Sequence, residues 1–294
     1  MEQAVARTGD SRALRRALAI TATFAIIEFA GGLWTNSLAL IADAGHMLTD
    51  VAALGLSLFA VWFARRPATP QQTYGYFRVE ILAALVNGAS LILIAVFVFY
   101  ESYGRFLNPE KVRTTEMMVI GVAGLLANLA TAWILHRGHQ HSLNVRGAFL
   151  HVLGDVLGSI AVILAGAAMW IWGVFWPDPL VSAIVCVLIL VSAWKLVRES
   201  VLILLEGAPS HVNLEAMREE LAKIAGVESI HDLHVWTLTS GVHVMTCHVV
   251  VCGDGNRDEI LTRLSSVSRD RFGVHHTTIQ IEDTRLCEGN HVCR

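Results

Sequence analysis

The chain has 294 residues, of which 54% are hydrophobic and 16% are charged, and its mean hydropathy is +0.53. This composition excludes an ordinary soluble domain of this length, and the apolar residues are concentrated in the first 205 positions. The net charge of −3 does not indicate nucleic-acid binding, and five cysteines without paired spacing do not indicate a disulfide scaffold. The first apolar run follows no small-residue cleavage site, so we expect a retained helix rather than a signal peptide.

Six apolar runs are long enough to cross a bilayer, which takes roughly 20 residues in a helix. Their approximate bounds are 16–34, 37–63, 79–100, 117–135, 145–172 and 180–201. The residues before position 12 are polar and are expected to lie outside the first span. Glu28 lies within the first span, and two interpretations stay open for it: a residue of a water-filled cavity or a partner in a helix–helix hydrogen bond.

The distribution of lysine and arginine predicts the orientation, because cytoplasmic loops carry an excess of these residues. One side of the six spans has eleven of them and the other side has three. The first group is Arg7, Arg12, Arg15, Arg16, Arg65, Arg66, Arg78, Arg137, Arg146, Lys195 and Arg198; the second is Arg105, Lys111 and Arg113. The first side is therefore predicted to be cytoplasmic, and six spans place both termini there.

Two of the apolar runs contain the same polar pattern, His-x-x-x-Asp. The second run has His46 and Asp50, and the fifth has His151 and Asp155. Residues four apart lie on one face of a helix, so the two helices together offer two imidazoles and two carboxylates, a tetrahedral set for a divalent metal. An ionisable group at the bilayer centre costs about 3 kcal/mol, and a shared cation compensates several at once. The alternative for any single one is a hydrogen bond between helices.

The residues from about position 207 change character and predict a small α+β domain. Residues 213–225 and 258–272 are predicted as helices, and 227–238, 242–251 and 277–281 as strands. This α-β-β-α-β order suits a ferredoxin-like or metallochaperone-like fold with helices on one face of the sheet. We therefore expect a transmembrane domain at 1–206 and a cytosolic domain at 207–294, the latter with reduced cysteines.

Metal-ligating side chains are dense in this second domain, which favours metal binding. They are His231, Asp232, His234, His243, Cys247, His248, His275, His276, Glu282, Asp283, Cys287, His291 and Cys293. Some are expected to be ordinary surface residues. Whether Cys287, His291 and Cys293 bind metal stays open, as it does for His136, His139 and His141 in the loop after the fourth span.

The chain resembles the cation diffusion facilitator family, in particular bacterial zinc, cadmium and cobalt efflux proteins. The resemblance rests on the six spans, the paired His-x-x-x-Asp motifs, and three segments at 37–46, 74–80 and 231–236. It implies a transport site of His46, Asp50, His151 and Asp155, with His at the first position associated with zinc over cadmium. It also implies a homodimer that exchanges zinc for protons.

The resemblance further implies a cytosolic metal site and a charge pair. The cytosolic ligands correspond to His231, His248, His275 and Glu282, with His275 and His276 competing for one role. The charge pair corresponds to Arg78 and Glu206. Some bacterial members have a further His/Asp site between the second and third spans, but the loop at 68–73 lacks such residues, so we do not expect that site.

The expected function is export of zinc from the cytosol across the inner (plasma) membrane in exchange for protons. Zinc would be both the substrate and a regulatory ligand of the cytosolic domain, and the lipid bilayer, protons and a second copy of the chain are the other expected partners. We do not expect an enzyme, because no His-Glu-x-x-His occurs and four protein ligands leave zinc no open position. The alternatives are a membrane-anchored zinc sensor and an intramembrane metalloenzyme. The ranking among zinc, cadmium, cobalt, iron and manganese stays open.

Overall fold

A computed structural model describes residues 2–64, 69–136, 143–239, 241–251 and 256–283. Within these ranges the side chains of 2–15, 17, 49–50, 53–54, 56–64, 135–136, 143–151 and 283 are left undescribed. The chain divides into two compact units. The first consists of Met1–Phe59 and Ala84–Val197, and the second of Ala60–Ala83 and Arg198–Arg294.

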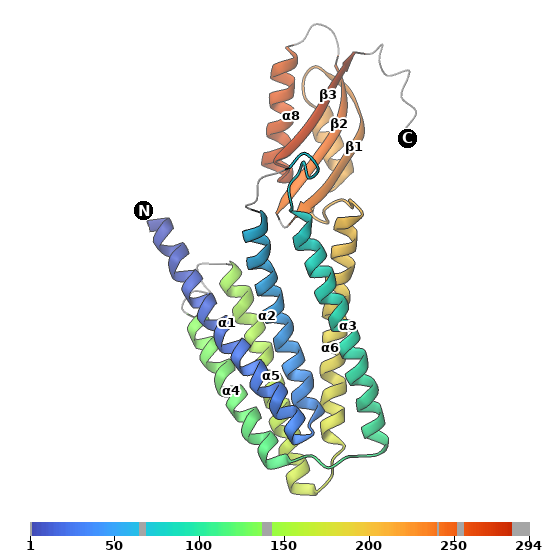
Figure 1. Cartoon of the computed structure of the whole chain (residues 1–294). Coiled ribbons are helices and arrows are strands. Elements are labelled where there is room, and N and C mark those ends of the chain that lie inside the picture. The colour runs from blue at the N-terminus through green and yellow to red at the C-terminus, as the bar shows by residue number, and fades with distance from the viewer. Residues whose placement is uncertain (1, 65–68, 137–142, 240, 252–255, 284–294) are drawn as a thin grey trace. The chain divides into compact units, whose positions relative to one another are not determined.

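Six long helices account for the apolar part of the chain (Figure 1). They are α1 (Glu2–Thr35), α2 (Leu38–Ala64), α3 (Arg78–Leu107), α4 (Thr114–His136), α5 (Leu143–Trp172) and α6 (Pro177–Leu204). Each contains one predicted span, but α1 begins well before the expected start near residue 16. Among the described residues, five of the six are long and apolar enough to cross a membrane. The exception is α2, whose described apolar part is Leu38–Leu48.

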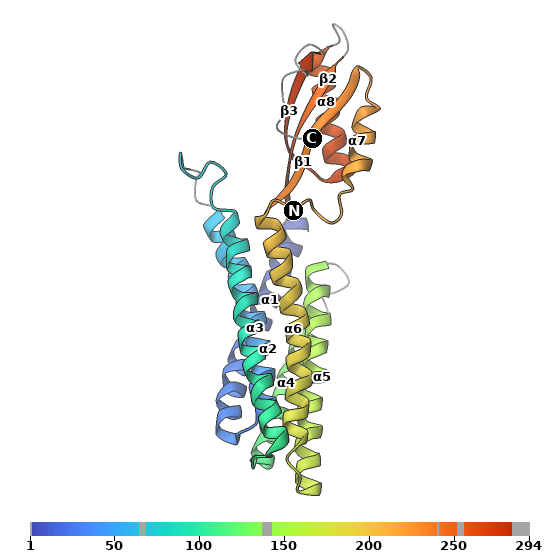
Figure 2. The same ribbon diagram turned by 90° about the vertical axis from the view of Figure 1, so that its right-hand side faces the viewer.

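Within the first unit, α2 contacts two sets of helices. Ala39 and Leu40 pack in one buried cluster with α4 and α5 residues such as Met117 and Val162. Ala42 belongs to a second cluster, formed with α3 and α6 residues such as Leu91, Ala95 and Ile189. Figures 1 and 2 show α3 and α6 running side by side. The helix that carries the first His-x-x-x-Asp motif is therefore central to this unit.

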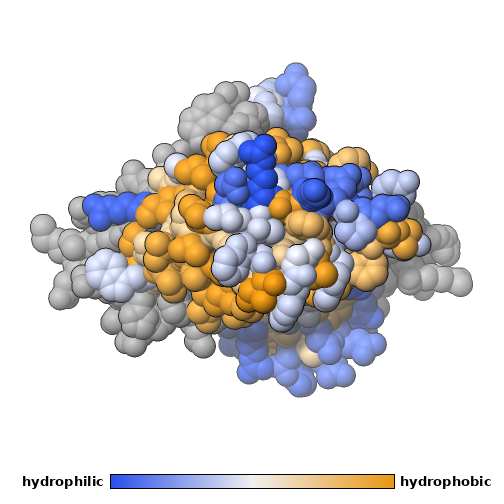
Figure 3. Space-filling view, turned by 90° about the horizontal axis from the view of Figure 1, so that it is seen from below, coloured by the Kyte–Doolittle hydropathy of each residue, from blue (hydrophilic) through white to orange (hydrophobic). Residues whose placement is uncertain are grey.

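Large apolar side chains cover the outer surfaces of these helices. Leu93, Phe97 and Val191 are 72%, 69% and 66% exposed. A soluble protein rarely exposes contiguous apolar surface of this kind, whereas a bilayer solvates it. Figure 3, seen from below the view of Figure 1, looks onto the end of the bundle where α1 joins α2, α3 joins α4 and α5 joins α6, and it shows hydrophilic residues gathered among the hydrophobic ones. This surface is that of a multi-pass membrane protein.

A buried aspartate fixes the start of α2. Asp178, in the first turn of α6, accepts hydrogen bonds from the Ser37 hydroxyl (2.5 Å) and the backbone N–H groups of Leu38 (2.8 Å) and Ala39 (3.2 Å). These amides belong to the first turn of α2 and have no partner within the helix, so Asp178 satisfies them as a capping residue would. The depth of α2 in the bundle is thereby tied to α6.

The second unit contains the predicted α-β-β-α-β domain. Its elements are α7 (Leu214–Ala222), β1 (Val227–Thr239), β2 (Val242–Val251), α8 (Arg257–Phe272) and β3 (His276–Asp283). The sheet order is β1-β2-β3, with β1 and β2 antiparallel and β2 and β3 parallel. Asn213 caps α7, and its side chain accepts hydrogen bonds from the N–H groups of Glu215 and Ala216.

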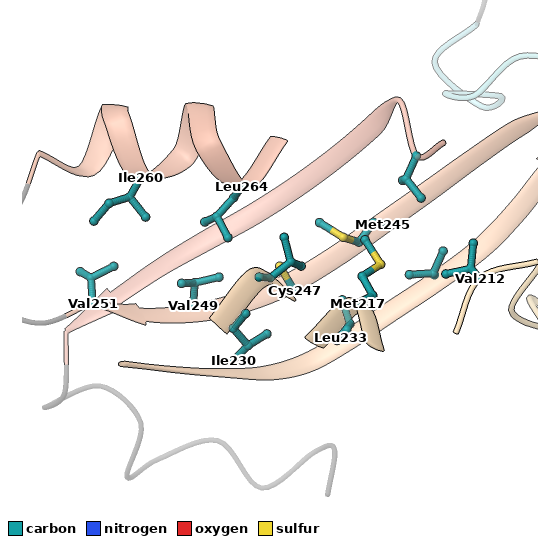
Figure 4. Packing of buried hydrophobic residues seen from close by; sticks show 13 residues of the cluster. Val212, Met217, Ile230, Leu233, Met245, Cys247, Val249, Val251, Ile260 and Leu264 are labelled. Carbon is teal, nitrogen blue, oxygen red and sulfur yellow. The ribbon is translucent and has the colours of Figure 1, made fainter. Parts of the chain in front are cut away.

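One face of this sheet is covered by both helices. Met217 from α7 and Ile260 and Leu264 from α8 pack against alternate β2 residues, of which Met245 and Val249 are two (Figure 4). Because successive side chains on a strand point to opposite faces, the intervening β2 residues point away from the helices. The open face of the sheet is therefore where polar residues of the strands can meet.

Candidate functional site

The first candidate site lies in the helical unit, between α2 and α5. His46 Nε2 is 3.6 Å from Asp155 Oδ1. The Asp155 side chain is only 2% exposed, whereas that of His46 is 30% exposed. An imidazole and a buried carboxylate from two different helices therefore meet, as the paired motifs predict. These two groups are ligands that zinc accepts in proteins.

The other two predicted ligands of this site lie one turn away on the same helices. Asp50 follows His46 by four residues on α2, and His151 precedes Asp155 by four residues on α5. Their backbones belong to these helices, and their side chains lie outside the described part of the chain. The complete four-residue set therefore stays a prediction, of which the structure shows one contact between the two helices.

Further buried polar groups surround this contact. Asp43 on α2 is 3% exposed and Glu28 on α1 is fully buried. Asn128 on α4 donates to the Ser159 hydroxyl at 3.1 Å, and that hydroxyl donates to the Asp155 carbonyl at 3.1 Å. Asp43 was not predicted as a ligand, although it precedes His46 by three residues and so shares its helix face.

The second candidate site lies on the open face of the sheet. His231 on β1 and His248 on β2 are register partners, and their ring centroids are 5.1 Å apart. Glu282 on β3 joins them, with His231 Nε2 3.1 Å from Oε2 and His248 Nδ1 2.7 Å from Oε1. One ligand atom from each residue lies within 4.8 Å of the others. Three strands thus bring together three groups that suit a divalent metal.

Two features orient this group on the open face of the sheet. Glu282 is 3% exposed, and Gln280 Nε2 donates to its Oε1 at 2.7 Å. A register shift in β1 falls between His231 and His234, where Asp232 has a φ of 49°. This irregularity lets both Ile230 and Leu233, three residues apart, pack in the core while His231 points to the open face.

The structure does not bring His275 to this group. His275 directly precedes β3, seven residues before Glu282, and at about 3.3 Å per residue it lies near the opposite end of the strand. Instead it is close enough to His243 to influence that side chain: burial, His211 and His275 together lower the pKa of His243. His276 forms a T-shaped contact with Tyr74, with ring centroids 5.9 Å apart. Neither histidine therefore completes the group within one protomer.

Of the other candidate ligands in the sequence, one cysteine is buried in the core and several residues lie outside the described part of the chain. Cys247 lies in the core beneath the sheet, 1% exposed, and burial raises the pKa of its thiol to about 11. It is therefore a core residue and not a ligand of the open-face group. His139, His141, Cys287, His291 and Cys293 lie outside the described residues, as does the side chain of His136.

The predicted charge pair is present in the second unit. Arg78 Nη2 lies 2.6 Å from Glu206 Oε1, with side chains 37% and 58% exposed. Glu206, two residues after the end of α6, has a left-handed conformation with a φ of 61°. The N–H groups of Glu206 and Gly207 bond back to the carbonyls of Ile203 and Leu202, which is the Schellman arrangement that glycine usually provides. A glutamate thus occupies a position that costs about 1 kcal/mol relative to glycine.

A hydrogen bond between the sheet and α3 was not predicted from the sequence. The Thr239 hydroxyl at the end of β1 donates to Glu80 in the first turn of α3. Arg78 and Glu206 also line a cavity of about 250 Å³ with Tyr74, Trp236 and neighbouring residues. No short-range pattern connects Thr239 to Glu80, so only the tertiary fold reveals this contact.

Comparison with known proteins places these features in one family. A family model described as the cation efflux transmembrane domain matches residues 14–205, and one described as the cation efflux protein, cytoplasmic domain, matches residues 209–284. The chain is 43% identical over 263 residues to the cadmium, cobalt and zinc/H(+)-K(+) antiporter of Bacillus subtilis (strain 168), covering 88% of this chain and 85% of the relative.

Two further relatives have similar coverage. The zinc transporter ZitB of Escherichia coli (strain K12) is 44% identical over 276 residues, or 93% of this chain and 88% of the relative. The metal cation efflux system protein CzcD of Cupriavidus metallidurans is 42% identical over 275 residues, or 93% and 87%. A solved metal-bound C-terminal domain of a CzcD transporter covers 24% of this chain and 99% of that chain, at 40% identity and a TM-score of 0.24. With its transmembrane model spanning well over half of the sequence, the chain belongs to the cation diffusion facilitator family.

Proposed function

We propose that this protein exports zinc from the cytosol in exchange for protons, with His46, Asp50, His151 and Asp155 as the transport site. The observation that carries the proposal is the 3.6 Å approach of His46 to the buried Asp155 between two membrane helices. A carboxylate there is costly to bury unless a cation or proton compensates it. Two nitrogen and two oxygen ligands suit zinc, and the names of the relatives support that metal.

The same ligands account for proton exchange. Zinc binds carboxylates and neutral imidazoles, so loading the metal displaces protons from the site. Histidine titrates near neutrality when unperturbed, with a pKa of about 6.5. Zinc would load from the cytosol, the helices would rearrange, and protons from outside would compete the metal off.

The domain at 207–294 is proposed to be cytosolic and to regulate transport. His231, His248 and Glu282 provide three ligands for zinc, which leaves one position of a tetrahedral site for water or a fourth ligand. The match to a cation efflux cytoplasmic domain named for dimerisation supports a homodimer. The excess of lysine and arginine on one side supports an inner-membrane protein with both termini inside.

Zinc flux in proteoliposomes tests the proposal. The full chain would be reconstituted, a pH gradient imposed, and the uptake of zinc, cadmium, cobalt, iron and manganese recorded separately. We expect zinc movement that rises with the gradient and stops when an ionophore collapses it. A protein that binds zinc but moves none would instead be a membrane-anchored sensor, the main alternative.

A further inference from the structure

Glu28 is buried in a way that the four-residue transport site does not explain. It lies within α1, its side chain is fully buried, and neither carboxylate oxygen has a hydrogen-bond partner among the described residues. The helix–helix hydrogen bond considered from the sequence is thus not found there. An ionised carboxylate buried without a partner costs several kcal/mol, so the Glu28 carboxyl needs either a proton or a cation to balance its charge.

Two glycines make room for carboxylates at this level of the bundle. A Cβ atom on Gly124 of α4 would collide with Oε1 of Glu28, and one on Gly158 of α5 would come to 3.0 Å of Asp43 Oδ1. Each carboxylate is therefore seated where a neighbouring helix has no side chain. The two acids come from α1 and α2, and the two spaces from α4 and α5.

The positions along the helices put both acids on one side of the His46–Asp155 contact. Asp43 precedes His46 by three residues, and Gly158 follows Asp155 by three. Because α2 and α5 are antiparallel, the Asp43–Gly158 contact lies three residues, about 4.5 Å, from the His46–Asp155 contact, toward the start of α2. Glu28 lies seven residues before the end of α1, and Asp43 five residues after the start of α2. The short turn between these helices therefore sets the two carboxyls at similar depth.

The carboxylates of Asp43 and Asp155 interact electrostatically with Glu28. Negative charges on Asp43 and Asp155 both repel a negative charge on Glu28. A divalent cation among them would replace this repulsion by attraction. We propose that Glu28 and Asp43 form a second, oxygen-only cation subsite, a release subsite that receives zinc from His46 and Asp155 on its way out. This inference rests on the proposed zinc export and adds a step to it.

The chemistry of the release subsite suits departure of the metal. Zinc binds imidazole nitrogen well, whereas carboxylate-only sites are better suited to harder ions such as manganese. A step of about one turn would thus move zinc from a set with imidazoles to one without them. On the proposed orientation, the start of α2 faces the outside, so this weaker set lies on the exit side.

The first test separates turnover from loading. Glu28→Gln and Asp43→Asn keep the shape of the side chain and remove its charge. The matched control is Glu101→Gln, which makes the same change at a partly exposed glutamate of α3. In proteoliposomes we expect each of the first two to lower kcat for zinc at least tenfold while KM changes less than twofold. The control should transport like the wild type. Unchanged kcat in both variants would overturn the proposal, as would loss of zinc binding at the transport site together with turnover.

The second test detects the subsite directly, with Mn²⁺ as the probe. Electron paramagnetic resonance of the full chain in detergent would count bound Mn²⁺ per protomer. We expect His46→Ala to retain the Mn²⁺ held by the release subsite and Glu28→Gln to lose it, with folding checked by gel filtration. Equal Mn²⁺ binding by wild type and Glu28→Gln would overturn the proposal. Absence of zinc flux in the wild type would instead contradict the proposed export itself, so the two failures are distinguishable.

Discussion

The two groups of candidate metal ligands are built on different secondary structures. In the helical unit, each helix supplies a His and an Asp four residues apart, so only one meeting of two helices is needed. In the sheet, each of three strands supplies one ligand, and the group exists only because the strands pair in one register. A change in register by one residue would turn a ligand to the opposite face.

The two groups also differ in how closely their atoms approach. His46 and Asp155 are 3.6 Å apart, whereas the contacts of Glu282 with His231 and His248 are 3.1 and 2.7 Å. The strands are held by ladder hydrogen bonds, whereas α2 and α5 are held by side-chain packing. A site that must release its metal benefits from helices that can rearrange, and a site that senses metal benefits from a fixed frame.

Removing a carboxylate from the helical group should have the largest effect on transport. We expect Asp155→Ala and Asp50→Ala each to lower zinc flux at least about 100-fold, because the site has no spare ligand, while the protein stays folded and dimeric. Flux in proteoliposomes and gel filtration would measure both properties. Glu199→Ala, which removes an exposed acid from α6, is the control. Normal transport by both variants would show that the site has been assigned to the wrong residues.

Changing the kind of ligand should alter selectivity rather than abolish transport. His46→Asp would convert two nitrogen and two oxygen ligands into one nitrogen and three oxygens. Harder ligands should raise the flux of manganese or cadmium relative to zinc by several-fold. Competition of each metal against zinc uptake would measure this ratio. The same ranking in the variant and the wild type would argue against His46 as a ligand.

In the sheet group, removal of one ligand should affect binding more than transport. We expect His248→Ala to weaken zinc binding to the fragment 207–294 at least about tenfold, with part of the transport of the full chain retained. Calorimetry on the fragment and flux on the full chain would be compared. His234→Ala is a matched control, since His234 is an exposed histidine of the same sheet that lies outside the group. Complete loss of transport with intact binding would contradict a regulatory role.

These differences decide how much the sequence could predict. The helices and strands follow from apolar periodicity and turn residues, and β2 has the bounds that were predicted for it. His46 and Asp155 could be proposed as partners because each belongs to a His-x-x-x-Asp pair, and residues four apart on a helix share a face whatever the tertiary fold. Asp43 follows the same rule, but a lone acid beside a stronger motif gives no separate signal.

The cytosolic ligands needed more than periodicity. The shift in β1 near Asp232 changes which residues face the core, and no composition rule reveals it. The family resemblance assigned His275 to this group, yet His275 lies seven residues from Glu282, and an extended strand separates residues by about 3.3 Å each. Helical spacing therefore indicated the two helix faces of which His46 and Asp155 are in contact, whereas the group on the sheet depends on strand register.

The charge pair should give the smallest effect and tests whether a contact can serve function at the expense of stability. Arg78 and Glu206 are partly exposed, and such pairs contribute about 1 kcal/mol or less. We expect Arg78→Glu to loosen the dimer and slow transport severalfold, with zinc affinity at the transport site preserved. Exchanging both charges, in Arg78→Glu with Glu206→Arg, should restore part of the loss. A double-mutant cycle on flux and dimerisation would measure the coupling, and purely additive losses would show that the residues act independently.

Glu206→Gly separates the pair from the helix end that it occupies. Glycine adopts a φ of 61° without the penalty of about 1 kcal/mol that a side chain incurs, so the variant should unfold at the same temperature as the wild type or higher. It nevertheless lacks the carboxylate that Arg78 contacts, so its transport should slow as in the charge reversal. Faster unfolding with normal transport would mean that Glu206 stabilises the end of α6 and has no part in transport. The expected opposite result means that the chain accepts a less favourable helix end in order to hold Arg78.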